Sequence, residues 1–218
     1  MTSLTLSGDG EVIHGHGTAM ASLILGQDFP AEGTAPAADL LDIRVADEEG
    51  GSNTALLAEG IIAAVDRRAD VINISLGAFG DSPVLRNAIE YALERQILVV
   101  ASAGNEKLLR VAYPAAYPGV IAVAAVDANN EQAYFSNSGE DLTLSAPGVG
   151  VLSAYLDDKI VIGSGTSQAA AVTTGAVAAM LSWGYDPAGV VQALRQNAVQ
   201  TTAAQEQVGA GVLRLPER

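Results

Sequence analysis

The sequence contains no cysteine, which excludes disulfides, thiolate metal sites and a cysteine nucleophile. It has only two histidines, His14 and His16, so any chemistry that needs an imidazole must take place in this one segment. Acidic residues outnumber basic ones by 25 to 11, for a net charge of −14. Nucleic acids and anionic membranes are bound by clustered Lys and Arg, so this charge argues against both as partners. No apolar run is long enough to span a bilayer, and the N-terminus lacks the pattern of a signal peptide, which favours a cytoplasmic location.

The 218 residues, 49% of them apolar and only 5% aromatic, are enough for one α/β domain with a core of small aliphatic side chains. Short apolar segments alternate with amphipathic ones, a pattern typical of a doubly wound, mostly parallel sheet with helices on both faces. Strands are predicted over residues 38–46, 70–76, 97–103, 119–127 and 141–148, and helices over 52–69, 81–96, 166–184 and 186–198. Residues 151–165 predict a hairpin that turns at Asp157 and Asp158, which we interpret as a solvated turn and not as metal ligands. There is no internal repeat or linker, so residues 1–218 are predicted to form a single domain.

The two histidines lie in "HGHGTAMASLILG", residues 14–26, where glycines lead into a helical pattern. A phosphate-binding loop of this kind needs a hydrophobic strand directly before it, and only Val12 and Ile13 stand there, which disfavours a dinucleotide site. As a catalytic element, His16 would lie at a helix start, where Gly17 allows a tight turn and Thr18 caps the first turn.

Two further loops carry residues that acyl transfer requires. In "ASAGN", Asn105 follows an apolar strand and offers a side-chain amide as a donor. In "GSGTSQAAA", Ser167 opens an apolar helix, whose positive N-terminus and free amides suit a nucleophilic hydroxyl. Each residue taken alone has an ordinary explanation as a loop residue, a turn residue or a helix cap. Only the presence of a base, a donor and a nucleophile in one chain indicates catalysis.

The segments "HGTAMA", "SAGN" and "GTSQAAA" resemble, in this order, the His, oxyanion-Asn and Ser motifs of the subtilisin-like serine proteases, the subtilases. The segments "DVINISLG", "YPAAYPGVIAVAAVD", "FSNSG", "LSAPG" and "GAGVL" also resemble that family, from about residue 14 to about residue 213. The resemblance implies a subtilisin-like fold and peptide-bond hydrolysis, with His16 as general base, Ser167 as nucleophile, and Asn105 as oxyanion donor beside the Ser167 amide. It further implies that an extended peptide substrate pairs between two backbone edges, formed by Ser75, Leu76 and Gly77 and by Ala103 and Gly104.

The resemblance fails at the triad acid. Subtilases place this Asp at the end of a strand roughly thirty residues before the His, and only fifteen residues precede His16. Asp9 and Glu11 are the only acids among them, and neither follows an apolar strand, so we assign no triad acid. We expect an N-terminally truncated fold in which an upstream segment or a separate chain supplies the strand that carries the Asp.

Smaller departures from the family's pattern concern the substrate pocket and the calcium-binding loop. Gln168 and Ala171 stand where the family usually has Met and Pro, and the loop "EKLLRVA" after Asn105 is short. Residues 26–33 lack the family's Asn-rich calcium-loop pattern, so no metal or other cofactor is predicted.

Two functions stay open on the sequence. One is a serine endopeptidase that hydrolyses peptides or proteins through an acyl-enzyme. The other is a catalytically inactive subtilase fold that serves as a peptide-binding or partner module, because the triad acid is missing. An esterase of the α/β-hydrolase type is disfavoured because no Gly-x-Ser-x-Gly elbow occurs.

Overall fold

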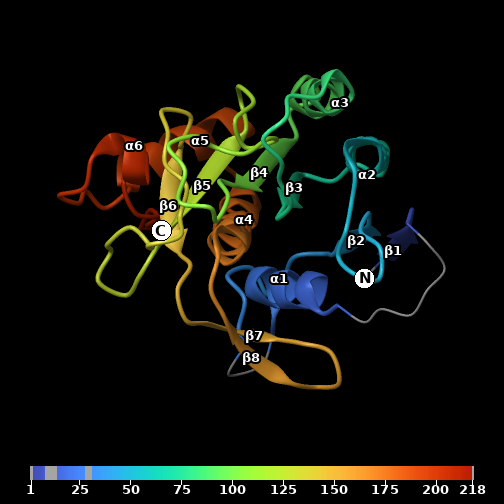
Figure 1. Cartoon of the computed structure of the whole chain (residues 1–218), viewed down its shortest axis with the longest axis horizontal. Helices are drawn as coiled ribbons and strands as arrows, with labels where there is room; N and C mark the ends of the chain where they lie inside the picture. The colour runs from blue at the N-terminus through green and yellow to red at the C-terminus, as the bar shows by residue number, and fades with distance from the viewer. Residues whose placement is uncertain (1, 8–13, 28–30, 218) are drawn as a thin grey trace.

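The structure, a computed structural model, describes residues 2–7, 14–27 and 31–217 (Figure 1). The elements follow one another as β1 (Thr2–Thr5), α1 (His16–Leu25), β2 (Leu41–Arg44), α2 (Thr54–Asp66), β3 (Val71–Ile74), α3 (Pro83–Leu93), β4 (Leu98–Ser102), β5 (Ile121–Val126), β6 (Leu144–Pro147), β7 (Val151–Ala154), β8 (Ile160–Gly163), α4 (Thr166–Ser182), α5 (Pro187–Asn197) and α6 (Gln205–Val208). All the predicted strands and helices are present, within shorter bounds than predicted. The polar strand β1 and the short helix α6 were not predicted. Within the described part of the chain, no helix is both long and apolar enough to cross a membrane.

The central sheet is parallel, has the strand order β3-β4-β5-β6, and is covered on both sides. All residues of β4 and β5 are buried, as expected for inner strands of such a sheet. Alternate side chains point to opposite faces: Val99 and Ala101 pack with α2 and α3, whereas Leu98 and Val100 pack with α4 and α5. The predicted mostly parallel α/β fold, with helices on both faces, is confirmed.

A second, separate sheet is formed by β1 and β2, which pair in parallel. Helix α2 connects β2 to β3, yet these two strands belong to different sheets, and Figure 1 shows β1 and β2 apart from β3–β6. Val71, Ile72 and Asn73 of β3 are only half-buried, although the neighbouring strand β4 is fully buried. Among the described residues, β2 and β3 therefore do not pair with each other. Within the same residues, each of these two strands has one edge without a partner strand.

Local sequence signals account for several of the helix starts. Asn53 accepts the backbone N–H groups of Ala55 and Leu56 at the start of α2. Ser82 caps α3 ahead of its first residue, Pro83. The hairpin β7–β8 is antiparallel and lies beside α1. It turns at Asp157 and Asp158, whose φ angles are 57° and 54°.

Candidate active site

His16 is the first residue of α1, and Gly15 occupies the N-cap position before it. A Cβ on Gly15 would lie 2.7 Å from ring carbons of Tyr155, so only glycine allows the hairpin to pack this closely beside the histidine. The prediction that Thr18 caps this helix is wrong, because the helix has already begun at His16 and has no side-chain cap. Gly17 likewise lies inside the helix and not at a turn.

The pKa of His16 is lowered from its ordinary value of 6.5. Burial is the largest cause, since it disfavours the charged imidazolium, and the nearby charge of His14 lowers the pKa further. A backbone hydrogen bond to Ser75 acts in the opposite direction and raises it. The imidazole is therefore neutral at neutral pH, which is the form that a general base requires.

No carboxylate pairs with the His16 ring among residues 2–7, 14–27 and 31–217. Asp9 and Glu11, the two acids before the histidine, lie outside the described residues. Within the described ranges there is also no group of three or more His, Asp or Glu side chains that could hold a metal ion.

Ser167 is the second residue of α4 and is 8% exposed. Ser75, the residue after β3, donates its hydroxyl to the Ser167 carbonyl oxygen at 3.3 Å and also hydrogen-bonds to His16 through its backbone. The carboxyl end of β3 thus brings the predicted base and nucleophile together, although they lie far apart in the sequence. No hydrogen bond joins the His16 ring to the Ser167 hydroxyl in the described part of the chain, and such bonds are often loose before substrate binds.

Asn105 is fixed by Thr166, the residue before the predicted nucleophile. Asn105 Oδ1 accepts the Thr166 backbone N–H at 2.8 Å and the Thr166 hydroxyl at 3.0 Å. Because both bonds use the amide oxygen, they orient the amide so that its Nδ2 hydrogens remain as donors, and the residue itself is exposed. Thr166 was not among the residues predicted for the site, although it stands directly before Ser167 in the sequence.

Two of the predicted substrate-binding residues, Ala103 and Gly104, use their backbone N–H groups in hydrogen bonds within the chain. The N–H of Ala103 donates to the Val123 carbonyl at 3.0 Å, and the N–H of Gly104 donates to Thr166 Oγ1 at 3.1 Å. Ala103 is also completely buried. Both N–H groups are therefore engaged within the chain, and the assignment of Ala103 and Gly104 to a substrate-binding edge stays a prediction.

Gln168, directly after the predicted nucleophile, is 8% exposed and carries a buried oxygen, Oε1, that has no hydrogen-bond partner among the described residues. Its amide packs over two glycines: a Cβ on Gly163 would lie 2.4 Å from Nε2, and one on Gly165 would lie 2.8 Å from Oε1. A buried polar atom without a partner is destabilising. A long polar side chain therefore fills the space beside Ser167 at a cost in stability.

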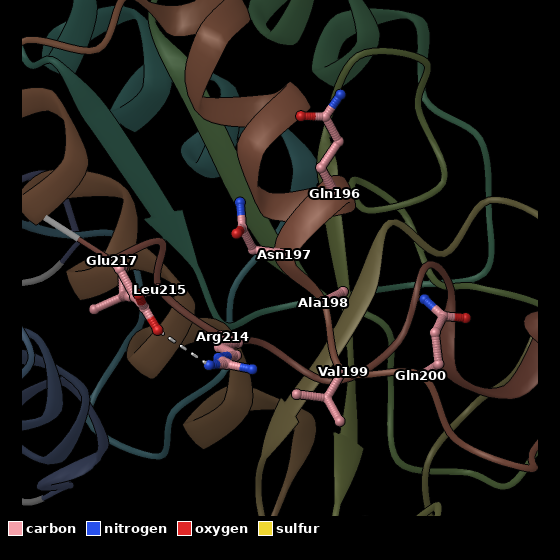
Figure 2. A pocket seen from close by; sticks show the side chains of 8 residues that line it. All are labelled: Gln196, Asn197, Ala198, Val199, Gln200, Arg214, Leu215 and Glu217. Atoms are coloured by element: carbon pink, nitrogen blue, oxygen red, sulfur yellow. Dashed lines mark ion pairs between the residues drawn. The ribbon is translucent and has the colours of Figure 1, made fainter.

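A pocket of about 570 Å³ lies elsewhere, between the end of α5 and the C-terminal segment (Figure 2). Its lining is mostly polar and includes the ion pair between Arg214 and Glu217, at 3.7 Å. It contains none of the predicted site residues.

Residues 8–212 match the Subtilase family. The thermostable alkaline protease of Halalkalibacterium halodurans is 41% identical over 190 residues, which cover 86% of this chain and 52% of that protein. The major intracellular serine protease of Bacillus subtilis is 38% identical over 178 residues, 78% of this chain and 56% of that protein. The chain thus spans about half the length of these curated relatives.

Solved structures of proteases superpose closely on this chain. The protease domain of PatA superposes with a TM-score of 0.89 at 32% identity, over 98% of this chain and 84% of that one. The prenylagaramide maturation protease PagA gives 0.88 at 31% identity, over 98% and 84%. The motifs of His16, Asn105 and Ser167 also occur in the family's order, and the parallel sheet is covered by helices on both faces. The chain therefore belongs to the subtilase family of serine proteases.

Proposed function

We propose that this domain is a serine endopeptidase that hydrolyses peptide bonds through an acyl-enzyme on Ser167. The observation that carries the proposal is the convergence around Ser75 and Thr166. Ser75 contacts both His16 and Ser167, and Thr166 orients the Asn105 amide beside the same serine. A neutral imidazole, a hydroxyl at a helix start and an oriented amide are the three groups that acyl transfer uses.

In the proposed reaction, the Ser167 hydroxyl attacks the substrate carbonyl carbon while its proton passes to His16. The carbonyl oxygen becomes an oxyanion, which the Asn105 amide and the Ser167 backbone N–H stabilise. The C–N bond then breaks, and the leaving amine takes the proton from His16. Water then attacks the acyl carbon while His16 takes its proton. The ester C–O bond to Ser167 breaks, and Ser167 recovers the proton from His16 as the acid product leaves. The backbone of Ser75, Leu76 and Gly77, at the end of β3, is the edge on which we place the extended substrate.

We further propose that a strand carrying an Asp completes the site by pairing between β2 and β3. Ser75, directly after β3, contacts His16. A Cβ on Gly50, in the loop that follows β2, would lie 3.8 Å from the His14 ring. The carboxyl ends of β2 and β3, each of which has one edge without a partner strand in the described part of the chain, therefore lead to the histidine segment, and a parallel strand between them would end there too. Its source is an upstream segment of the same polypeptide or a separate chain.

The proposed nucleophile is tested by labelling with a peptide phosphonate, which reacts with activated serines. We expect mass spectrometry to find the phosphonyl group on Ser167, and to find none in Ser167→Ala. His16→Ala should slow the labelling strongly because the hydroxyl then lacks its base. A label on another residue, or equal labelling of Ser167→Ala, would contradict the assignment. Labelling at a rate that His16→Ala leaves unchanged would instead favour an inactive, peptide-binding module.

A further inference from the structure

Asn137 is a fully buried asparagine, 0% exposed, that the proposed reaction does not use. It belongs to "FSNSG", in the loop between β5 and β6. A buried side-chain amide is costly unless its oxygen and its N–H groups find partners. The partners that Asn137 has found therefore indicate what the residue does.

All the side-chain hydrogen bonds of Asn137 go to residues 103–108, the loop that carries Asn105. Oδ1 accepts the backbone N–H groups of Glu106 at 3.1 Å and Leu108 at 2.9 Å. Nδ2 donates to the Ala103 carbonyl at 3.0 Å and to Glu106 Oε2 at 2.9 Å. One side chain thus ties together the two ends of this loop.

Gly104, immediately before Asn105, is held from two sides. Its carbonyl oxygen accepts the backbone N–H of Asn137 at 3.0 Å, and its own N–H donates to Thr166 Oγ1 at 3.1 Å. The φ angle of Gly104 is +107°, and a Cβ there would lie 2.2 Å from Asn137 Nδ2. The Asn137 amide therefore fills the space of the absent side chain and packs directly against the turn that presents Asn105.

We propose that Asn137 is a positioning residue, which fixes the 103–108 loop so that the Asn105 amide points at the oxyanion. The inference rests on the proposed role of Asn105 as oxyanion donor. Thr166 holds the side chain of Asn105, and Asn137 holds the backbone that carries it, so the donor is fixed from two independent elements. Misplacing such a group by about 1 Å costs about 10²-fold in rate.

The test is the rate of Ser167 phosphonylation, resolved into KI and kinact, in the parent chain and in Asn137→Asp. The substitution keeps the shape and the acceptor oxygen, but it removes both Nδ2 donors and sets a carboxylate against Glu106. We expect kinact to fall about 10- to 100-fold, with KI unchanged within about twofold. In protein that already carries Asn105→Ala, the same substitution should change kinact by less than about twofold, because the group through which Asn137 acts is gone.

Two further variants separate positioning from general destabilisation. Thr143→Val is the matched control: Thr143 is 2% exposed and its hydroxyl accepts the Ala122 N–H at 3.1 Å, away from the Asn105 loop. It should lower Tm without lowering kinact. Adding Glu106→Gln to Asn137→Asp restores an amide opposite the carboxylate and should recover part of kinact. If Asn137→Asp does not fold, Asn137→Ser serves for the same comparison.

The outcomes are distinguishable. If Asn137→Asp leaves kinact unchanged while Asn105→Ala lowers it, the positioning role is overturned and the proposed function stands. If the effects of the two substitutions multiply, Asn137 acts on something other than Asn105, and the inference is again wrong. If Asn105→Ala has no effect on kinact, the oxyanion role itself fails, and the inference fails with it.

Discussion

A strand that ends in a carboxylate should convert this chain into a much faster enzyme. The perturbation is an apolar peptide of about eight residues ending in Asp, a normal strand length, mixed with the 218-residue chain. The same peptide ending in Asn is the matched control, because it can pair with the sheet in the same way but supplies no charge.

The expected gain in rate follows from what the acid does. In the proposed reaction, without a carboxylate behind it, the His16 ring would be neither held in the correct tautomer nor stabilised as the imidazolium that would form when Ser167 gives up its proton. In a subtilisin, loss of this Asp alone costs about 3 × 10⁴ in kcat, or about 6 kcal/mol of transition-state stabilisation. The Asp peptide should therefore raise turnover of a peptide anilide by up to about this factor, and the Asn peptide by far less.

The affinity of the peptide is set mainly by its side chains. The unpaired edges of β2 and β3 are each four residues long. A strand between them forms about eight backbone hydrogen bonds, worth about 4–12 kcal/mol net, and ordering four residues costs about 4–8 kcal/mol. Backbone pairing roughly offsets the ordering entropy, so binding depends on buried apolar side chains, at about 1.5–3 kcal/mol each. A polar peptide of equal length should not bind.

The pH dependence gives a second readout. The lowered pKa of His16 means that the labelling rate of the chain alone falls only at a pH below 6.5. Because the folded pKa lies below the unfolded one, His16 also contributes stability above pH 6.5 that is lost as the pH falls towards its folded pKa. A carboxylate beside the ring favours the imidazolium. The Asp peptide should therefore move the acid limb to higher pH, and the Asn peptide should not.

If the Asn peptide raises turnover as much as the Asp peptide does, the proposed role of the carboxylate is wrong. It is also refuted if the chain alone hydrolyses peptides at an ordinary protease rate of about 1–10³ s⁻¹. Asp9 and Glu11 would then have to be tested as the acid, by substitution with Asn and Gln.

Substitutions at three other positions have expected outcomes. Asn105→Ala and Asn105→Asp should both lower kcat by about 10²–10³ or more with little change in KM. The two variants should differ in their free energy of unfolding, measured in urea. Asn105→Ala should be about 1–3 kcal/mol less stable than Asn105→Asp, because only Asp keeps an acceptor for the Thr166 N–H. Equal free energies of unfolding would contradict the orientation of the Asn105 amide. His14→Gln should raise the pKa of His16, followed by NMR titration, because it removes the electrostatic interaction with His14 that lowers this pKa; an unchanged pKa would show that burial alone sets the shift. Gln168→Met should raise the free energy of unfolding by about 1–3 kcal/mol, since it replaces a buried oxygen without a partner; a loss of stability would mean that Oε1 is satisfied in solution.

Local sequence was sufficient for most elements of the fold, with β1 and α6 as the exceptions. The apolar runs of β4 and β5 and the apolar surface of α4 predict buried strands and a buried helix, because each pattern depends only on neighbouring residues and its period. Ser82 and Pro83 marked the start of α3 for the same reason. The site segments were also readable, because Asn105 and Ser167 each lie directly beside an apolar element that ends or begins there.

Only the tertiary structure decided how those segments meet. The bonds from Thr166 to Asn105 and from Asn137 to the 103–108 loop join residues that are distant in sequence, and no local pattern encodes such pairs. A separate bond, from the Gly104 N–H to Thr166 Oγ1, is likewise not encoded by any local pattern. The interruption between β2 and β3 could not be predicted from the sequence period either. An alternating or apolar pattern predicts that a segment is extended, but which strands pair is determined only in the folded chain.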